Sequence, residues 1–391
     1  MTERGELTAD PQTIDTPPAA EPDEGRGRRE RLRSALSLLG SLQGYIGLIL
    51  VVAFGIISKG QTFWNSQNIN NAITGFATRG ILAVGETMVI LAAGIDLSVG
   101  SMLGLSSMVA AMLMVNVNMP VYLIPFACMA AGLGMGYLNG LGSTKLRIQS
   151  FVMTLATLSI FRGIDRQISD NVSVGTQQVD NSGHLTHSSQ QFQIYGTPGH
   201  NILQGSYVPG FGHNGIPYPM VAFFAAVIVF QLVLSKSKFG RHIYAVGGNE
   251  TAAKLSGVNV DRVRIGVFML AGLLAGLAGP IDAAYNASAD PLAGTSYELD
   301  AIAAAVIGGA NLTGGRGTIV GTLVGALILT LLDNVLGLNA VSDNAQLIIK
   351  GLIVVAAVVI QRPDLLRSTS AAVRRWARAG RSLLSGKASR G

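Results

Sequence analysis

The sequence predicts an all-α, polytopic integral membrane protein with about ten transmembrane helices and an internal repeat. Three observations support this fold class. Only 13% of the 391 residues are charged, whereas soluble domains carry roughly 25%. The apolar residues gather in runs close to the roughly 20 residues that a membrane-spanning helix needs. One short motif also occurs in similar form in both halves of the chain.

The chain divides into two polar tails and one long apolar region. Residues 1–40 contain no early apolar stretch of the signal-peptide kind, and their Pro, Glu, Asp and Arg content predicts a disordered tail. Residues 41–362 form the predicted transmembrane domain, and residues 363–391 form a basic tail. Its interleaved Arg and apolar residues favour a helix on the membrane surface. The candidate spans lie at residues 42–58, 70–93, 99–115, 120–141, 150–164, 217–234, 263–287, 298–309, 317–335 and 344–361.

The positions of Lys and Arg predict the orientation, because short basic loops stay in the cytoplasm. Basic residues precede the first span, and ten crossings bring the chain back to the same side. The loop at residues 236–264 holds six Lys or Arg residues and two acidic ones. We therefore expect this loop and both termini in the cytoplasm. The long loop at residues 165–216 is then extracytoplasmic.

The remaining polar features do not favour other classes of protein. The net charge of +6 lies in tails and short loops, not on the basic face that a nucleic-acid binder needs. His184 and His187 in the outer loop have no accompanying carboxylate or Cys cluster. We interpret that loop as solvated, and we predict neither a metal site nor a cofactor.

The repeated motif is the first candidate for the solute path. Residues 94–100 resemble residues 309–315, with Asp96 matching Asn311 and Ser98 matching Thr313. Gly-interrupted segments at matched positions of a transporter point to its binding site. We predict that these four side chains border the translocation path. The alternative is two ordinary polar turns whose Asp, Asn, Ser and Thr residues cap the following helices.

Further polar residues lie inside the predicted spans. Asn139 and Asn334 are neutral, and they are suited to bind sugar hydroxyls on the path or to bond neighbouring helices. Lys350 lies deep in its span, and Asp333 in the preceding span is a candidate partner. The stretch 295–298 has the pattern of a capping box.

A short cytoplasmic helix is predicted within the loop at residues 236–264. Asn249 is a good N-cap, and Glu250 and Lys254 have the favourable spacing for an ion pair. Gly257 is suited to the left-handed conformation that ends a helix. A helix this short is not stable alone, so we expect it to dock against a partner. The other residues of this coupling surface are Ala252, Ala253 and Leu255.

Four stretches carry a resemblance to a known family. They lie at residues 81–101, 239–257, 297–304 and 306–309, and they occur in the same order in the ribose and xylose permeases of bacterial ATP-binding cassette (ABC) importers. The resemblance implies a homodimer of permeases, a separate ATPase that receives the 249–257 helix in a groove, and an extracytoplasmic sugar-binding protein. It also implies monosaccharide import across the bacterial cytoplasmic (inner) membrane, with no enzymatic activity in this chain.

Other transport functions are weighed against this one. The chain contains no G-x-x-x-x-G-K-[ST] phosphate loop, so its energy comes from another polypeptide or from an ion gradient. A proton-coupled secondary transporter would use Glu86, Asp96 or Asp300 as its carboxylate relay. A permease of the same family for a nucleoside or another solute is a further alternative.

Overall fold

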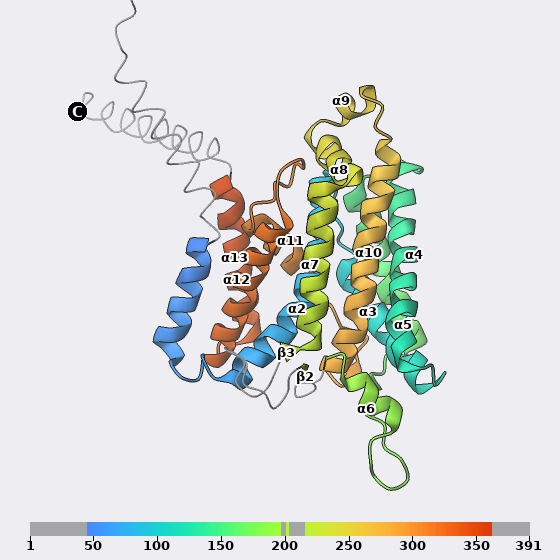
Figure 1. Ribbon diagram of the computed structural model, residues 1–391, viewed down its shortest axis with the longest axis vertical. Coiled ribbons are helices and arrows are strands. Elements are labelled where there is room, and N and C mark those ends of the chain that lie inside the picture. The colour runs from blue at the N-terminus through green and yellow to red at the C-terminus, as the bar shows by residue number, and fades with distance from the viewer. Residues whose placement is uncertain (1–44, 197–200, 203–215, 362–391) are drawn as a thin grey trace, which may run out of the picture. The chain divides into compact units, whose positions relative to one another are not determined.

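Helices dominate the computed structural model, which describes residues 45–196, 201–202 and 216–361 (Figure 1). The predicted tails at residues 1–40 and 363–391, and part of the predicted outer loop, lie outside the described residues. Within the described part the structure is mostly helical, as predicted, and it adds four strands of two residues each.

The helices are Tyr45–Lys59, α2 Ser66–Leu91, α3 Val99–Val115, η1 Val121–Leu123, α4 Ile124–Thr144, α5 Ser150–Ile168, α6 His187–Gln193, α7 Tyr218–Lys236, α8 Lys238–Gly248, α9 Glu250–Leu255, α10 Val260–Tyr285, α11 Tyr297–Ile307, α12 Ile319–Leu338 and α13 Asp343–Gln361. The strands are β1 Val174–Gly175, β2 Asn201–Ile202, β3 Ile216–Pro217 and β4 Ser288–Ala289. Strand β1 pairs antiparallel with β4, and β2 pairs antiparallel with β3.

Five of the described helices are long and apolar enough to cross a membrane, namely α2, α4 with η1, α7, α10 and α12. The helix Tyr45–Lys59 and α3 are apolar but shorter. Helices α5, α11 and α13 coincide with predicted spans without meeting that description. The total of ten spans therefore stays a prediction.

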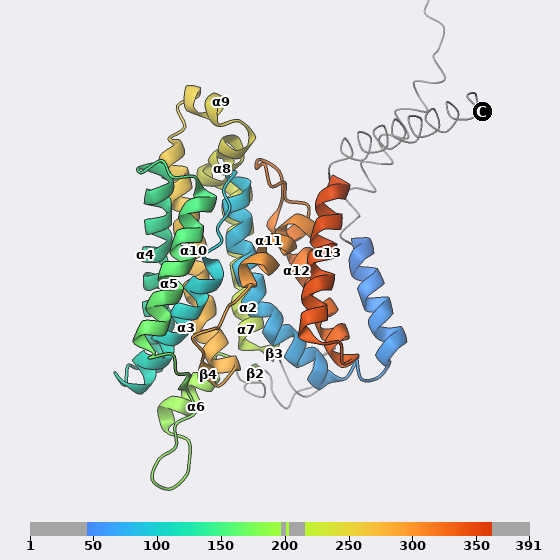
Figure 2. The ribbon, with the colours of Figure 1, turned by 180° about the vertical axis from the view of Figure 1, so that it is seen from behind.

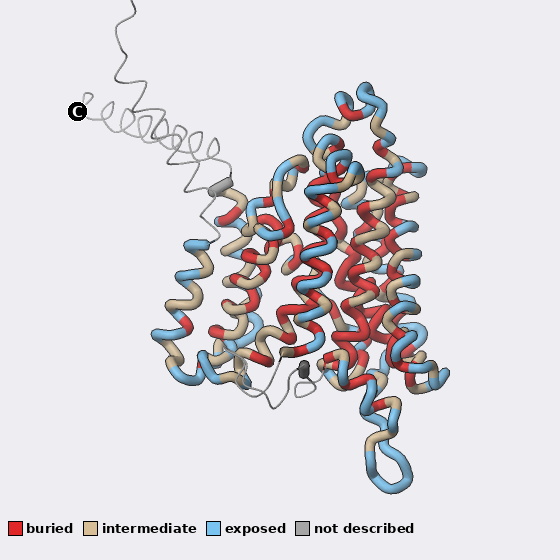
Figure 3. The backbone as a smooth tube through the Cα atoms, in the orientation of Figure 1, coloured by how far each residue is buried: buried red, intermediate tan, exposed pale blue. Residues whose placement is uncertain are grey.

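Helices α4 and α10 approach each other through glycine. A Cβ at Gly136 would overlap the Phe268 carbonyl oxygen, and a Cβ at Gly272 would overlap the Gly132 carbonyl oxygen. Small residues at four-residue spacing allow membrane helices to bring their backbones together. Figure 3 shows the resulting buried interior along α3 and α10, whereas α9 and the hairpin before α6 are mostly exposed.

In two helix triplets, α2–α4 and α10–α12, the first helix of each triplet packs against all three helices of the other. Helix α10 packs on α2, α3 and α4, and α2 packs on α10, α11 and α12. In Figure 1 and Figure 2, α2 and α10 run in opposite directions, and the shorter helices α3 and α11 lie between α5 and α13. The triplets α2–α4 and α10–α12 are thus inverted copies. By this pairing the segment 92–98 corresponds to 286–296, not to the matched motif at residues 309–315.

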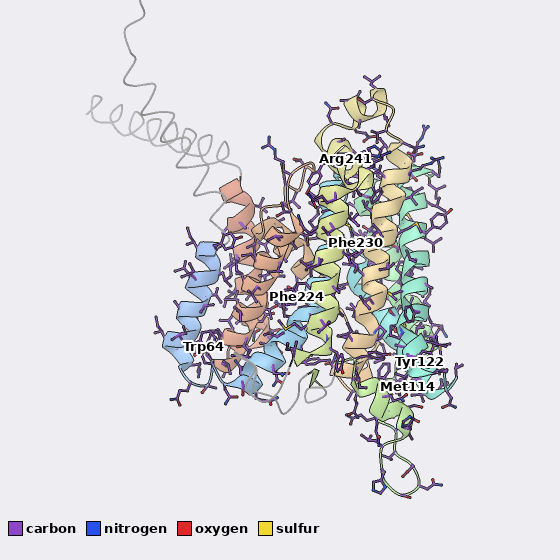
Figure 4. All side chains as sticks on the ribbon, viewed as in Figure 1. Trp64, Met114, Tyr122, Phe224, Phe230 and Arg241 are labelled. Atoms are coloured by element: carbon purple, nitrogen blue, oxygen red, sulfur yellow. The ribbon has the colours of Figure 1, made fainter. Side chains whose placement is uncertain are left out.

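The molecule has two distinct ends. The α9 side carries α8 and α9 together with the described end of α13, and the helix Tyr45–Lys59 runs from part-way along the bundle to the α6 side (Figure 1). The α6 side carries the strands and α6. Figure 4 places Arg241 at the α9 side, and Trp64 and Tyr122 at the α6 side. Trp64 and Tyr122 are 54% and 66% exposed, which suits aromatic residues at a membrane–water interface.

Candidate functional site

Asp96 lies in the connector between α2 and α3 and is fully buried. Its Oδ1 accepts hydrogen bonds from the Ser98 backbone N–H at 2.8 Å and from the Ser98 hydroxyl at 2.6 Å. The Asp96 backbone N–H donates to Glu86 Oε1 on α2 at 3.2 Å. Asp96 therefore closes a tight turn just before α3 and ties that turn to α2.

Helices α4 and α5 complete this buried polar network. Asn139 Nδ2 on α4 donates to Ser98 Oγ at 2.8 Å and lies 3.5 Å from Asp96 Oδ2. Thr157 Oγ1 on α5 donates to Asn139 Oδ1 at 2.7 Å. Thr154 Oγ1 accepts from the backbone N–H of residue 97 at 3.1 Å. Three of the six predicted path residues, Asp96, Ser98 and Asn139, thus meet in one network.

The network has the character of a fixed internal support. Asp96, Ser98 and Asn139 all have 0% exposed surface, and their side-chain polar atoms bond to this turn, to each other or to Thr157. Buried polar groups that satisfy one another make a connector rigid. Among the described residues, Glu86 Oε2 has no hydrogen-bond partner. In this conformation the network binds the α2–α3 connector, and its role in the solute path stays a prediction.

The other half of the repeated motif has the same local turn in a different place. Asn311 Oδ1 accepts the Thr313 backbone N–H at 3.1 Å, as Asp96 accepts that of Ser98. However, this turn joins α11 to α12, and Thr313 is exposed. The matched motifs therefore share a side-chain-to-backbone turn and not a common site.

Asn334 lies apart from both turns. Its side chain exchanges two hydrogen bonds with Asn68 at the start of α2, at 3.1 and 2.9 Å. The two amides therefore join α12 to α2. The structure does not bring Asn334 together with the other predicted path residues.

A cleft of 650 Å³ lies on the α9 side. The α2–α3 connector forms one wall with residues 92–95, and Arg147 and other residues of the α4–α5 loop form another. Glu250, Lys254 and Arg264 contribute from α9 and α10. Residues of the predicted coupling surface and the start of the α2–α3 connector, which carries Asp96, therefore line the same cleft.

Helix α9 forms as its sequence predicts. Asn249 Oδ1 accepts the Ala252 backbone N–H at 2.9 Å, which confirms the predicted N-cap. At the other end Gly257 has a φ of +82°. Its N–H donates to the Lys254 carbonyl, and the Val258 N–H donates to the Ala253 carbonyl, both at 3.0 Å. These two bonds form a Schellman motif, which ends the helix.

Two cations hold Glu250 on α9. Its Oε1 lies 2.7 Å from Lys254 Nζ, as predicted, and its Oε2 lies 2.7 Å from Arg264 Nη2 on α10. The hydrogen bond from Lys254, with the charge of Arg264, lowers the pKa of Glu250 below its ordinary value. The carboxylate is therefore ionised at neutral pH and links α9 to α10.

One apolar side chain of α9 has no cover. Leu255 is 86% exposed, whereas Ala253 on the same helix is buried. Helix α9 projects beyond the ends of the long helices (Figure 1), so Leu255 lies outside the membrane-spanning part. An exposed leucine on a rigidly capped helix suits a contact with another protein.

A four-residue ion cluster, the α2–α13 charge cluster, joins α2, α11, α12 and α13. Arg79 Nη1 lies 2.6 Å from Asp333 Oδ2, and Arg79 Nε lies 3.8 Å from Asp300. Lys350 Nζ lies 3.2 Å from Asp300 and 3.4 Å from Asp333. The predicted pairing of Lys350 with Asp333 is confirmed. The two cations and two carboxylates sum to zero charge, as burial among apolar helices requires.

The predicted capping box at residues 295–298 is wrong. The residue before α11 is Ser296, with a φ of +67° and no side-chain hydrogen bond to the helix. Thr295 Oγ1 instead donates to the Leu292 carbonyl at 2.6 Å. Arg162 of α5 donates to the Pro291 and Ala293 carbonyls at 2.9 and 2.7 Å. This distant arginine, and not a local cap, holds the segment before α11.

Comparison with known proteins places the chain among transport permeases. Residues 68–358 match the family described as "Branched-chain amino acid transport system / permease component". The chain is 39% identical over 318 residues to the ribose import permease protein RbsC of Haemophilus influenzae, covering 81% of this chain and 91% of the relative. It is 41% identical over 326 residues to the RbsC of Bacillus subtilis, covering 83% and 94%.

A xylose permease is also similar. The chain is 35% identical over 361 residues to the xylose transport system permease protein XylH of Haemophilus influenzae, covering 82% of this chain and 96% of the relative. No solved structure matches the chain.

Proposed function

The chain belongs to the branched-chain amino acid transport system / permease component family, and on that premise we propose that it is the membrane-spanning subunit of an ATP-driven monosaccharide importer. Helix α9 carries the proposal of ATP coupling. It is capped at both ends and linked to α10 by the ion pair of Glu250 with Arg264, and its Leu255 is 86% exposed. Such a helix suits the groove of a separate ATPase.

The proposed solute is a ribose- or xylose-like sugar. The relatives are named for ribose and xylose, and these sugars are uncharged. Within the described helices, the α2–α13 charge cluster is internally neutral, so it offers no single free charge for an ionic solute. A branched-chain amino acid is the second candidate, because the family description names that class.

The orientation and partners follow from the same proposal. The α9 side is cytoplasmic, where an ATPase binds, and both termini lie on that side of the bacterial inner membrane. The α6 side then receives the sugar from an extracytoplasmic binding protein. Two copies of the chain pair in the membrane, so that two α9 helices contact two ATPase subunits.

Reconstitution tests the energy source and the solute together. The permease is placed in liposomes with the ATPase and binding protein encoded in neighbouring reading frames, and uptake of radiolabelled ribose, xylose and leucine is measured. We expect ATP-dependent uptake of ribose or xylose that an uncoupler leaves unchanged. Uptake that needs no ATPase and stops with an uncoupler would instead establish a proton-coupled transporter. Uptake of leucine alone would establish the amino acid as solute.

A charge at Leu255 tests the docking surface. In Leu255→Asp the new carboxylate is buried without a partner against the ATPase, so we expect little ATPase to co-purify and uptake to fall at least tenfold. Val179→Asp is the control for ATPase co-purification alone, because Val179 is a 61% exposed apolar residue on the α6 side, away from α9. Normal co-purification and uptake by Leu255→Asp would contradict the assignment of α9.

A further inference from the structure

Three backbone segments from distant parts of the chain meet on the α9 side. They are the end of α2 at Leu91, the end of α8 at Gly247, and the α11–α12 connector at Gly314 and Gly315. The Gly315 N–H donates to the Leu91 carbonyl at 3.0 Å. We call these four residues the glycine junction.

The junction leaves no space for a side chain. A Cβ at Gly247 would overlap the Leu91 carbonyl oxygen and would lie 2.6 Å from the Gly315 nitrogen. A Cβ at Gly314 would lie 2.8 Å from Ala93 Cβ and 2.9 Å from Gly247 Cα. Real side chains do not approach other atoms this closely, so each segment touches the next through its backbone.

A side-chain hydrogen bond also joins α8 to the α11–α12 connector. The Tyr244 hydroxyl on α8 donates to the Gly317 carbonyl in the α11–α12 connector at 2.8 Å. Burial raises the pKa of Tyr244, so this hydroxyl keeps the proton that it donates. Helix α8 therefore contacts the α11–α12 connector through both Tyr244 and Gly247, and it contacts α2 through Gly247.

We infer that the glycine junction transmits movement of the α8–α9 segment to α2 and to the α11–α12 connector, and that Gly247 is its central positioning residue. Close-packed backbones move together, whereas an intervening side chain can change rotamer and absorb a displacement. Helix α2 leads through its connector into α3, and the α11–α12 connector leads into α11. One contact thus reaches both of the short helices inside the bundle. The inference rests on the proposed function of α9.

The neighbouring glycine supplies a matched control. A Cβ at Gly248 would meet no atom within 4 Å. Gly247 and Gly248 are the last two residues of α8, and neither has a positive φ. Gly247→Ala and Gly248→Ala therefore make the same chemical change at adjacent positions, and only the first enters the junction.

The experiment measures the ratio of sugar imported to ATP hydrolysed. Wild type, Gly247→Ala and Gly248→Ala are reconstituted with the ATPase and binding protein, and uptake of radiolabelled ribose and xylose is compared with phosphate release. We expect all three to retain the ATPase and basal hydrolysis. The ratio should fall at least tenfold in Gly247→Ala and stay within twofold of wild type in Gly248→Ala.

Three results would overturn the inference. They are a ratio within twofold of wild type in Gly247→Ala, an equal loss in Gly248→Ala, and loss of ATPase binding in Gly247→Ala. The last would show a role in docking and not in transmission. A wild-type permease that transports without the ATPase would refute the proposed function itself, which separates the two failures.

A milder variant covers the case in which Gly247→Ala does not insert. Tyr244→Phe keeps the ring and removes the hydrogen bond to Gly317. We expect two- to fivefold loss of the same ratio with normal insertion and ATPase binding. If Gly247→Ala fails to insert and Tyr244→Phe leaves the ratio of sugar imported to ATP hydrolysed unchanged, the junction has a structural role only.

Discussion

Breaking the pair between Arg79 and Asp333 tests whether the α2–α13 charge cluster acts as one neutral unit. Arg79 Nη1 and Asp333 Oδ2 are 2.6 Å apart, and the side chains are 31% and 16% exposed. Two unit charges ~4 Å apart gain about 4 kcal/mol at an effective dielectric constant near 20. Partial exposure reduces this, so we expect Asp333→Asn to lower the free energy of unfolding by about 2–3 kcal/mol.

The double variant with Arg79→Gln and Asp333→Asn tests whether the cluster depends on its net charge. Arg79→Gln alone leaves Lys350 facing two carboxylates, and Asp333→Asn alone leaves Asp300 facing two cations. Together they restore zero net charge and keep Lys350 and Asp300, which lie 3.2 Å apart. We therefore expect the double variant to cost little more than one single variant. This corresponds to a coupling energy of about 2 kcal/mol.

Equilibrium unfolding of the four proteins in mixed detergent measures this coupling. The exposed pair of Glu250 and Lys254, with side chains 36% and 58% exposed, is the control. Its cycle of Glu250→Gln and Lys254→Gln should give a coupling of at most about 0.5 kcal/mol. Additive costs for Arg79→Gln and Asp333→Asn, within roughly 0.5 kcal/mol, would refute the neutral-unit argument.

The remaining predictions concern the two turns and the cap of α9. Asp96→Asn places an amide group beside Asn139 and should cost about 1–3 kcal/mol of stability, and uptake per inserted protein within twofold of wild type would leave the turn as its role. A large loss of uptake at unchanged stability would instead favour the path. Asn311→Ala removes an exposed turn bond and should cost about 0.5–1.5 kcal/mol with uptake unchanged, as measured by radiolabelled sugar. Asn249→Ala should cost about 1 kcal/mol and reduce co-purified ATPase severalfold, with normal recovery a contradiction.

The features that sequence predicted best depend on residues close together in the chain. The cap at Asn249, the pair of Glu250 with Lys254 and the stop at Gly257 all lie within one short segment, and each forms as expected. Lys350 and Asp333 lie on helices joined by a short connection, so their pairing was also accessible. Arg79 was not accessible, because it enters the cluster from α2.

The features that sequence missed depend on distant helices. From α5, Thr154 bonds the Asp96 turn and Thr157 bonds Asn139, and their only signal was two threonines three residues apart in an apolar run. The two copies of the repeated motif do form the same local structure, but that structure is a turn of three residues and not a shared site. The inverted triplets α2–α4 and α10–α12 left no comparable motif, because helix packing tolerates many sequences of small and apolar residues.

Helix α2 connects the three parts of the molecule that this chemistry singles out. Leu91 belongs to the glycine junction, Glu86 bonds the Asp96 turn, and Arg79 belongs to the α2–α13 charge cluster. Leu91 and Arg79 are separated by roughly 18 Å along one continuous helix, at 1.5 Å per residue. A displacement of α8 that moves Leu91 therefore also acts on the support of α3 and on the contacts to α11, α12 and α13. In the proposed importer the short helices need no separate connection to the ATPase, since α2 would supply one to both halves of the inverted repeat.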